Sequence, residues 1–245
     1  MGTVEVLLTD FERTLVRLFG DDSDVERQFL AEVQDECVGR HVPDSVLKAP
    51  GSSPYSLWMN AYKRVKQHDD IRAEMLHHAV SKIAKRYEMK AAKSIRLFDD
   101  VPPVLERFKL AGIPVVIVSN NATAAVELVL EKNDAKRLVD HVIGREYIHK
   151  MVGNLKPKPN LLEKALKRAG HAAGAALLVG DSVDDMRAGR KARIRRRVAL
   201  LEHSTATRLQ LRTAGARHIL QTFGDLPDLP EIQRVLGRSD ASVGR

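Results

Sequence analysis

The sequence contains a single cysteine, Cys37, among its 245 residues. One cysteine cannot form an intramolecular disulfide and cannot supply a zinc site made of several cysteines. The chain also lacks the run of about 18–20 apolar residues that a membrane-spanning helix requires. Its first residues, MGTVEVLLTDFERTL, lack the basic and then apolar pattern of a secretory signal. We therefore expect a cytoplasmic protein with no membrane association.

Hydrophobic residues make up 44% of the chain and charged residues 29%. This apolar fraction is sufficient for a packed core and excludes a disordered or collagen-like chain. At roughly 150 residues per domain, the length favours one large domain or one domain with a smaller insert.

Short apolar runs indicate strands that are buried on both faces of a parallel sheet. They occupy residues 3–9, 113–118, 175–179 and 198–201. Amphipathic helical patterns lie between the later runs, at residues 101–110, 123–131 and 160–169. Strand and helix in alternation predict an α/β fold with a doubly wound parallel sheet.

The alternation stops between residues 17 and 95, where only helical patterns occur, at 25–38, 53–67 and 71–88. Ser53 and Pro54 form a typical helix start, with serine as N-cap and proline at the first helical position. Tyr55, Trp58 and Tyr62 follow on one face of this helix, and we interpret them as packing residues rather than substrate contacts. We expect a core domain formed by residues 1–16 and 96–245, with residues 17–95 as an all-helical insert.

Polar residues follow the predicted strands at the points where the strands end. Asp10 and Glu12 follow the first run, Ser119 and Asn120 the second, and Asp181 and Asp185 the third. Ligands of open parallel sheets bind at the carboxyl ends of the strands. Carboxylates suit Mg²⁺, and a lysine with a hydroxyl suits phosphate oxygens. Taken singly, each of these residues is also compatible with an ordinary turn or helix cap.

Four motifs in order carry a resemblance to a known family. They are D-x-[D/E]-x-T at 10–14, S-N at 119–120, K-P-x-P at 156–159 and G-D-S-x-x-D at 180–185. In this order the chain resembles the haloacid dehalogenase superfamily, most closely its phosphoglycolate-phosphatase-type members. The resemblance implies a Rossmann-like core with a helical cap inserted after the first motif. It also implies a Mg²⁺-dependent phosphatase that acts on a small phosphorylated metabolite.

The resemblance implies a role for each carboxylate. Asp10 would attack phosphorus and form an aspartyl-phosphate, which splits one difficult displacement into two easier ones. Mg²⁺ would be held by Asp10, by the main-chain carbonyl of Glu12 and by Asp181, with Asp185 also at the metal. The metal would shield the charge of the nucleophile from the phosphate.

The same resemblance implies a set of phosphate contacts. Ser119 and Asn120 would form hydrogen bonds with the phosphoryl oxygens. Lys156 would neutralise these oxygens and help to keep Asp10 ionised. Lys158 stands two residues further on, but the family places its lysine first in the K-P-x-P pattern, which favours Lys156.

Glu12 departs from the family pattern, because related phosphatases usually carry aspartate two residues after the nucleophile. That residue protonates the leaving oxygen and then activates water. The extra methylene of glutamate moves the carboxyl group by roughly 1 Å, and such a misplacement can cost on the order of 100-fold in rate. Three interpretations stay open: Glu12 is the acid/base, it supports slow turnover, or the chain binds phosphates without turnover. A phosphomutase is a further alternative, and a dehalogenase fits less well because it does not require Asp181.

The excess of positive charge is local. Seven cations and no acid lie between Arg187 and Arg197, and without them the net charge of +8 falls to +1. The stripe begins in the helix that follows Asp181, so we expect it to point away from the phosphate site. Cations at a helix C-terminus are favoured by the helix dipole. We interpret the stripe as a solvated face and do not expect a nucleic-acid partner. The alternative interpretation is that the stripe binds an acidic partner or nucleic acid.

Overall fold

The computed structural model describes residues 3–19, 24–48, 53–146 and 155–240. The chain divides into two compact units. One is drawn from the ranges Met1–Leu18, Lys93–Glu146 and Gly153–Arg245, and the other from Phe19–Ala92. The first unit contains the sheet and is called the core unit below. The second contains helices in its described part and is called the helical unit.

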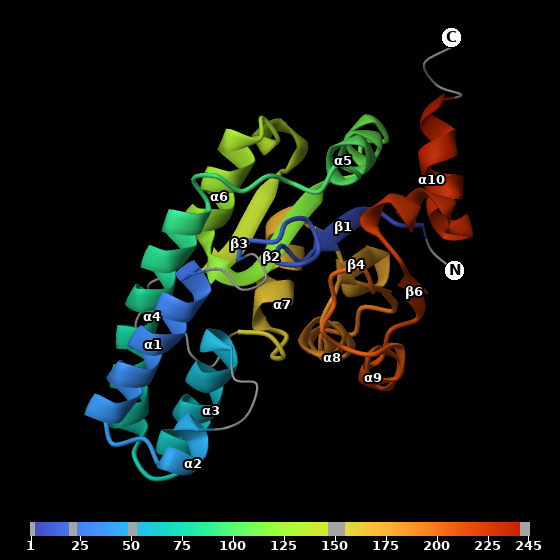
Figure 1. The fold of residues 1–245 in the computed structure, drawn as a ribbon. Coiled ribbons are helices and arrows are strands. Elements are labelled where there is room, and N and C mark those ends of the chain that lie inside the picture. The colour runs from blue at the N-terminus through green and yellow to red at the C-terminus, as the bar shows by residue number, and fades with distance from the viewer. Residues whose placement is uncertain (1–2, 20–23, 49–52, 147–154, 241–245) are drawn as a thin grey trace. The chain divides into compact units, whose positions relative to one another are not determined.

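The core unit is built on a sheet of six parallel strands in the order β3-β2-β1-β4-β5-β6 (Figure 1). The strands are β1 (Val6–Thr9), β2 (Val115–Ala122), β3 (His141–Arg145), β4 (Ala176–Gly180), β5 (Arg196–Leu200) and β6 (His218–Leu220). The strand order reverses between β1 and β4, and this is the doubly wound arrangement expected from the sequence. The carboxyl ends of β1 and its two neighbours are therefore the place where a ligand site is expected.

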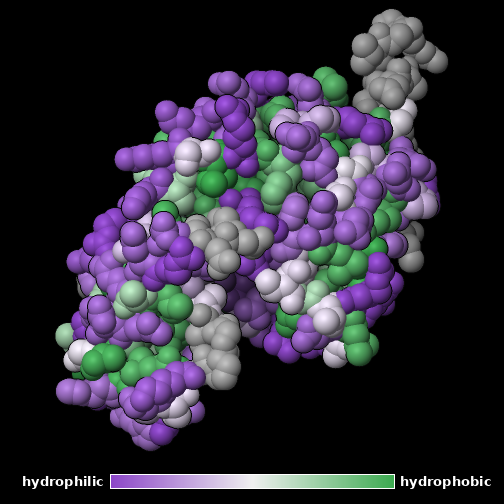
Figure 2. Space-filling view, in the orientation of Figure 1, coloured by the Kyte–Doolittle hydropathy of each residue, from purple (hydrophilic) through white to green (hydrophobic). Residues whose placement is uncertain are grey.

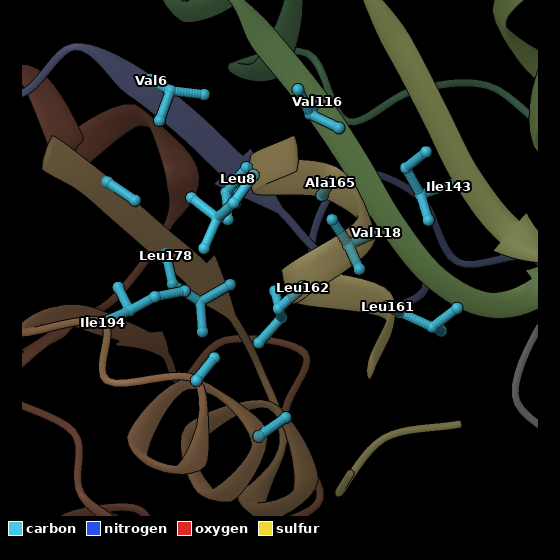
Figure 3. Close-up of a cluster of buried hydrophobic side chains, with 14 of the residues drawn as sticks. Val6, Leu8, Val116, Val118, Ile143, Leu161, Leu162, Ala165, Leu178 and Ile194 are labelled. Atoms are coloured by element: carbon cyan, nitrogen blue, oxygen red, sulfur yellow. The ribbon is translucent and has the colours of Figure 1, made fainter. Parts of the chain in front are cut away.

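Apolar side chains from alternate strand positions form the core. Leu8 of β1 lies between Val116 of β2 and Leu178 of β4 in the sheet. These three side chains are buried on one face together with residues of α7 (Asn160–Ala169) and α8 (Val183–Lys191), as Figure 3 shows. Burying a leucine of this kind stabilises the fold by about 1.5–3 kcal/mol.

The remaining core helices follow the alternation of strand and helix. They are α5 (Val101–Leu110), α6 (Thr123–Lys132), α9 (Arg208–Ala214) and α10 (Pro230–Asp240), with short 3-10 turns at Lys136–Leu138, Ala173–Ala175 and Phe223–Asp228. Helix α5 packs on β2, and α10 packs on α5. Helix α7 ends at Gly170, whose φ of 74° places it in the left-handed region that glycine adopts without strain.

The helical unit contains α1 (Asp24–Gly39), α2 (Asp44–Leu47), α3 (Pro54–Lys66) and α4 (Asp70–Ala91). The hydroxyl of Ser53 accepts a hydrogen bond from the amide of Ser56 at the start of α3, so the predicted helix start is confirmed. Trp58 is buried and packs against His77 of α4, with 4.8 Å between the ring centroids and 31° between the ring planes. Tyr62 is also buried, so these two residues pack between helices as the sequence predicts.

Exposed large hydrophobic side chains are few and scattered in the described part of the chain: Val38, Ile71, Met75, Leu110 and Leu209. Figure 2 shows one mostly hydrophilic face with small apolar areas. None of the helices, as far as the chain is described, combines the length and the apolar character needed to cross a bilayer.

Candidate active site

Asp10 lies directly after β1, at the centre of the sheet and at the carboxyl ends of its strands. Its amide donates a hydrogen bond of 2.8 Å to the carbonyl of Val179, which ties the end of β1 to β4. The residue is 6% exposed. Its side chain therefore starts from a fixed main-chain position and lies in a buried environment.

Lys156 is buried against Asp10. Its ammonium group donates hydrogen bonds to Oδ1 of Asp10 at 2.5 Å, to Oδ1 of Asp185 at 2.6 Å and to the carbonyl of Val118 at 2.9 Å. A lysine ammonium has three N–H donors, so every donor has an acceptor in this arrangement. Lys156 thereby connects β2, the end of β1 and the first turn of α8.

Asp185 belongs to the first turn of α8 and is fully buried. Its Oδ2 accepts hydrogen bonds from the amide and the hydroxyl of Ser182, at 3.1 and 2.5 Å, while the Ser182 hydroxyl accepts from the Asp185 amide. This reciprocal cap fixes the carboxylate and starts the helix. Gly180 leaves space for it, because a Cβ at this position would lie 2.6 Å from Cγ of Asp185.

Three carboxylates share this buried space. Ligand atoms of Asp10, Asp181 and Asp185 all lie within 4.8 Å of one another. Burial and the charge of Asp185 raise the pKa of Asp10 to about 6, against the lowering effect of Lys156. Burial, Asp10 and Asp185 raise the pKa of Asp181 well above its usual range. Burial alone would lower the pKa of Lys156, but the two carboxylates beside it raise the value above that of a free lysine.

The charges of this cluster fit a divalent cation. Three carboxylates and one ammonium carry two net negative charges when all are ionised. Burial is the largest cause of the raised pKa values of Asp10 and Asp181, and the neighbouring carboxylates raise them further. Carboxylate oxygens are hard ligands of the kind that Mg²⁺ prefers. Among the described residues, this is the one group of acidic, histidine or cysteine side chains close enough to hold a metal ion.

Ser119 and Asn120 lie within β2, beside a register irregularity between Val118 and Ala122. The Ser119 hydroxyl is buried and donates a 2.9 Å hydrogen bond to Oδ1 of Asn121. The Asn120 side chain reaches the main chain of Lys156, accepting from its amide at 2.9 Å and donating to its carbonyl at 3.2 Å. Asn120 therefore fixes the backbone from which the Lys156 side chain extends.

Glu12 is half-buried, and its Oε2 accepts a 2.9 Å hydrogen bond from the amide of Leu18. This bond closes the turn after Asp10, in which Glu12 and Val16 also form an isolated bridge. Arg17 lies in the same segment, with Nη2 3.3 Å from Nδ1 of His203. The structure thus places the Glu12 carboxylate on the turn itself, with its position set by the Leu18 amide.

Lys158 and three basic residues of the helical unit are exposed. Lys158 is exposed, whereas Lys156 is buried at Asp10. Lys63, Arg64 and His68 are exposed at the end of α3 in the helical unit, and Arg64 contacts His68 there.

Two residues of the site were not anticipated from the sequence. Buried Arg145, at the end of β3, donates a 2.6 Å hydrogen bond to the carbonyl of Asn120. Arg13 has a φ of 59° in the turn after Asp10 and lowers the pKa of Asp181 by its charge, while burial and the neighbouring carboxylates raise that pKa. A left-handed backbone at arginine leaves no pattern in the sequence.

Comparisons with known proteins agree with this geometry. The chain is 30% identical to a phosphoglycolate phosphatase of Aliivibrio fischeri over 124 residues, which cover 51% of this chain and 53% of that protein. It therefore spans about half the length of this curated relative. A phosphoglycolate phosphatase of Aquifex aeolicus is 26% identical over 197 residues, covering 80% of this chain and 85% of the relative.

The fold and the family agree as well. The crystal structure of a haloacid dehalogenase-like hydrolase from Bacteroides fragilis matches 91% of this chain and 100% of its own, with a TM-score of 0.65 and 21% identity. The family model described as haloacid dehalogenase-like hydrolase matches residues 23–199, which is more than half of the chain. This protein belongs to the haloacid dehalogenase-like hydrolases.

Proposed function

We propose that this protein is a Mg²⁺-dependent phosphatase that hydrolyses a small phosphorylated metabolite through an aspartyl-phosphate on Asp10. One observation carries the proposal. The buried Lys156 ammonium holds Asp10 and Asp185 at 2.5 and 2.6 Å, beside Asp181, at the carboxyl ends of the central strands. Such a site combines a fixed carboxylate nucleophile, a cation for phosphate oxygens and an acidic ligand set.

Asp10 attacks phosphorus while the bond between phosphorus and the leaving oxygen breaks. The pKa of about 6 leaves most of Asp10 ionised at neutral pH, and the Lys156 hydrogen bond orients its carboxylate. A water molecule then attacks the phosphorylated Asp10, the bond between phosphorus and the Asp10 oxygen breaks, and phosphate leaves. The carboxylate is regenerated for the next cycle.

Asp10, Asp181, Asp185 and the main-chain carbonyl of Glu12 are the ligands we assign to Mg²⁺. A bound Mg²⁺ supplies positive charge that offsets the repulsion between the carboxylate nucleophile and the phosphate. The two net negative charges of the cluster support this assignment, because a buried excess charge is costly without a counter-ion. Asp185 also holds Lys156, so it links the metal ligands to the phosphate site.

We assign Ser119, Asn120 and Lys156 to the phosphoryl oxygens. The Asn120 side chain is engaged with the main chain of Lys156, so its contribution to phosphate binding comes from its main chain. The Ser119 hydroxyl turns from Asn121 toward the phosphate when a substrate binds. Lys156 supplies the positive charge that neutralises these oxygens.

Glu12 is the proposed general acid and base. It gives its proton to the leaving oxygen and takes a proton from the attacking water. Its position on the turn after Asp10 supports this role, and the Leu18 amide fixes its carboxylate. Slow turnover, or phosphate binding without turnover, is the alternative that follows from the longer side chain.

We assign the helical unit, within residues 17–95, as the cap of the enzyme. In this role it opens for substrate entry, closes to exclude bulk water and selects the substrate. A phosphomutase of the same fold is the second candidate, because it would use the same Asp10 and differ in protecting the phosphorylated aspartate from water.

One assay tests the proposal. Hydrolysis of a panel of phosphate monoesters is measured with and without Mg²⁺, for the wild type and for Asp10→Asn. We expect Mg²⁺-dependent release of phosphate by the wild type and none by the variant. Activity that survives Asp10→Asn, or no turnover of any ester, would refute the enzymatic proposal. Transfer of phosphate between positions of a sugar phosphate without release would indicate the phosphomutase.

A further inference from the structure

A second charged region lies in the core unit, at the edge of the sheet opposite the site. Arg195, Arg196 and Arg197 are at the start of β5, and Arg217 precedes β6. Arg190 and Arg193 are at the end of α8, which runs back from the carboxyl ends of the strands. We call Arg190, Arg193, Arg195, Arg196, Arg197 and Arg217 the amino-edge cluster.

The members of this cluster are connected by direct contacts. The amide of Arg217 donates to the carbonyl of Arg197 at 2.8 Å, and the amide of Arg193 donates to the carbonyl of Arg190 at 3.1 Å. A Cβ at Gly215 would lie 3.4 Å from the guanidinium nitrogens of Arg197 and 3.6 Å from Cδ of Arg190. Arg190, Arg197 and Arg217 therefore lie close together between the end of α8 and the starts of β5 and β6.

As far as the chain is described, five of the six arginines are not paired with a carboxylate. Within the residues that the structure describes, no salt bridge joins a carboxylate to Arg190, Arg193, Arg195, Arg197 or Arg217. The helix dipole favours Arg190 at the end of α8, but Arg195, Arg197 and Arg217 lie outside that helix. The helix dipole thus explains only a minor part of the positive charge of this cluster.

Arg197 is buried and is held by main-chain oxygens. It is 7% exposed, and its guanidinium donates to two main-chain carbonyls, those of Gly215 and Ile194, instead of a carboxylate. Burial and the charges of Arg217 and Arg190 lower the pKa of Arg197. A buried cation without a counter-ion is unfavourable in the free protein and is relieved by a bound anion.

Arg193 has an unfavourable backbone conformation. It follows the end of α8 with a φ of 61°, in the left-handed region, whereas Gly170 occupies the corresponding position after α7. Glycine adopts this conformation freely, and arginine is not among the residues enriched in it. The exposed Arg193 thus adds charge to the surface where glycine would be more stable.

The chemistry of the cluster fits phosphate groups. Arginine presents a planar fork of donors that matches phosphate oxygens, and the exposed Lys191 beside Arg190 adds a further cation. The four exposed members, Arg190, Arg193, Arg195 and Arg217, present such donors to solvent.

We propose that the amino-edge cluster binds the phosphate backbone of a nucleic acid without reading its sequence. This differs from the expectation drawn from the sequence, where neither the position of Arg217 nor the burial of Arg197 is visible. Binding occurs at the opposite edge of the sheet from Asp10, so it does not require the phosphatase reaction. Nucleic acid is therefore a second ligand of the protein and not its substrate.

The test is salt-dependent binding of the full chain to a labelled duplex DNA and a labelled single-stranded RNA, by fluorescence anisotropy. The variant is the triple substitution Arg190→Gln, Arg193→Gln and Arg195→Gln. Each lost phosphate contact reduces the slope of log K against log salt by about 0.9 on duplex DNA, so we expect a slope smaller by about 2.7. Unchanged hydrolysis of phosphate monoesters, or an unchanged circular dichroism spectrum, verifies that the variant is folded.

A matched control removes three exposed cations elsewhere, by Lys85→Gln, Lys90→Gln and Arg107→Gln. The proposal requires that this control keeps the slope of the wild type. No binding to either nucleic acid at low salt would overturn the proposal, as would equal losses in both triple variants. Displacement by polyglutamate at an equal concentration of charge would overturn it in favour of an acidic protein partner.

Arg193→Gly gives an independent readout. We expect it to raise the melting temperature, because the left-handed position is relieved, and to weaken nucleic-acid binding at the same time. A variant that is more stable and binds as tightly as the wild type would contradict the role of Arg193.

Discussion

The ionised carboxylate of Asp10 is expected to destabilise the folded protein when no metal is bound. Its folded-state pKa is about 6, against 3.8 for an ordinary aspartate, mainly because it is buried. The folded state therefore binds more protons than the unfolded state between about pH 4 and 6. Stability falls as pH rises through this interval. At about 1.4 kcal/mol for each pKa unit, the difference of about 2 units corresponds to roughly 3 kcal/mol.

The perturbation is Asp10→Asn, which removes the titrating group and keeps its shape. Above pH 6 and without divalent cations, we expect the variant to be more stable than the wild type by up to about 3 kcal/mol. For a chain of this size that is a rise in melting temperature of about 6–12 °C. At pH 4 the Asp10 carboxyl group is protonated in the folded wild type, so the two proteins should have similar stability.

The assay is thermal unfolding in EDTA at pH 4, 5, 6 and 7.5, followed by circular dichroism. Asp184→Asn is the control, because Asp184 is the neighbouring half-buried carboxylate on α8 and lies outside the cluster. A variant that is no more stable than the wild type at pH 7.5 would refute the reasoning. A gain of equal size at every pH would also refute it, because the gain then does not come from ionisation.

The other predictions concern neighbouring residues. At 100 times its dissociation constant, Mg²⁺ should stabilise the wild type by about 2.7 kcal/mol and so raise its melting temperature. Asp181→Asn should abolish this rise; a rise that the variant retains would show that metal binding does not need Asp181. Lys156→Gln should lower the free energy of unfolding by about 3–5 kcal/mol in urea at pH 7.5, because it leaves buried carboxylates unpaired; a neutral effect contradicts this. Gly180→Ala should cost about 1–3 kcal/mol, because its Cβ collides with Asp185; unchanged stability would show that the site adapts. Glu12→Asp should change kcat by up to about 100-fold, and the direction in a steady-state assay shows whether the pocket is fitted to glutamate; equal rates argue against a role in proton transfer.

The interior strands were predictable because each contains a continuous apolar run. Residues of β1, β2, β4 and β5 lie in runs buried on both faces, and the four predicted strands are confirmed. The two strands at the edges of the sheet, β3 (HVIGR) and β6 (HIL), were missed. Edge strands are short and partly exposed, so they tolerate histidine and arginine and leave no continuous apolar pattern.

The site was also predictable only in part. The motifs predict Asp10, Lys156 and Asp185, and the structure brings these three residues into contact. The bonds from Asn120 to Lys156 and from Arg145 to Asn120 join residues that are 36 and 25 positions apart. Contacts of this kind depend on the packing of β2, β3 and the turn before α7, and spacing along the chain does not reveal them.

The central claim is that phosphate is transferred to Asp10. The most direct measurement is mass spectrometry of the protein quenched in acid during turnover of a phosphate monoester with Mg²⁺. The account predicts that the peptide containing Asp10 gains the mass of one phosphoryl group, that hydroxylamine removes it, and that Asp10→Asn never acquires it. A phosphoryl group on a different residue, or turnover with no phosphorylated peptide at any quench time, would contradict the account.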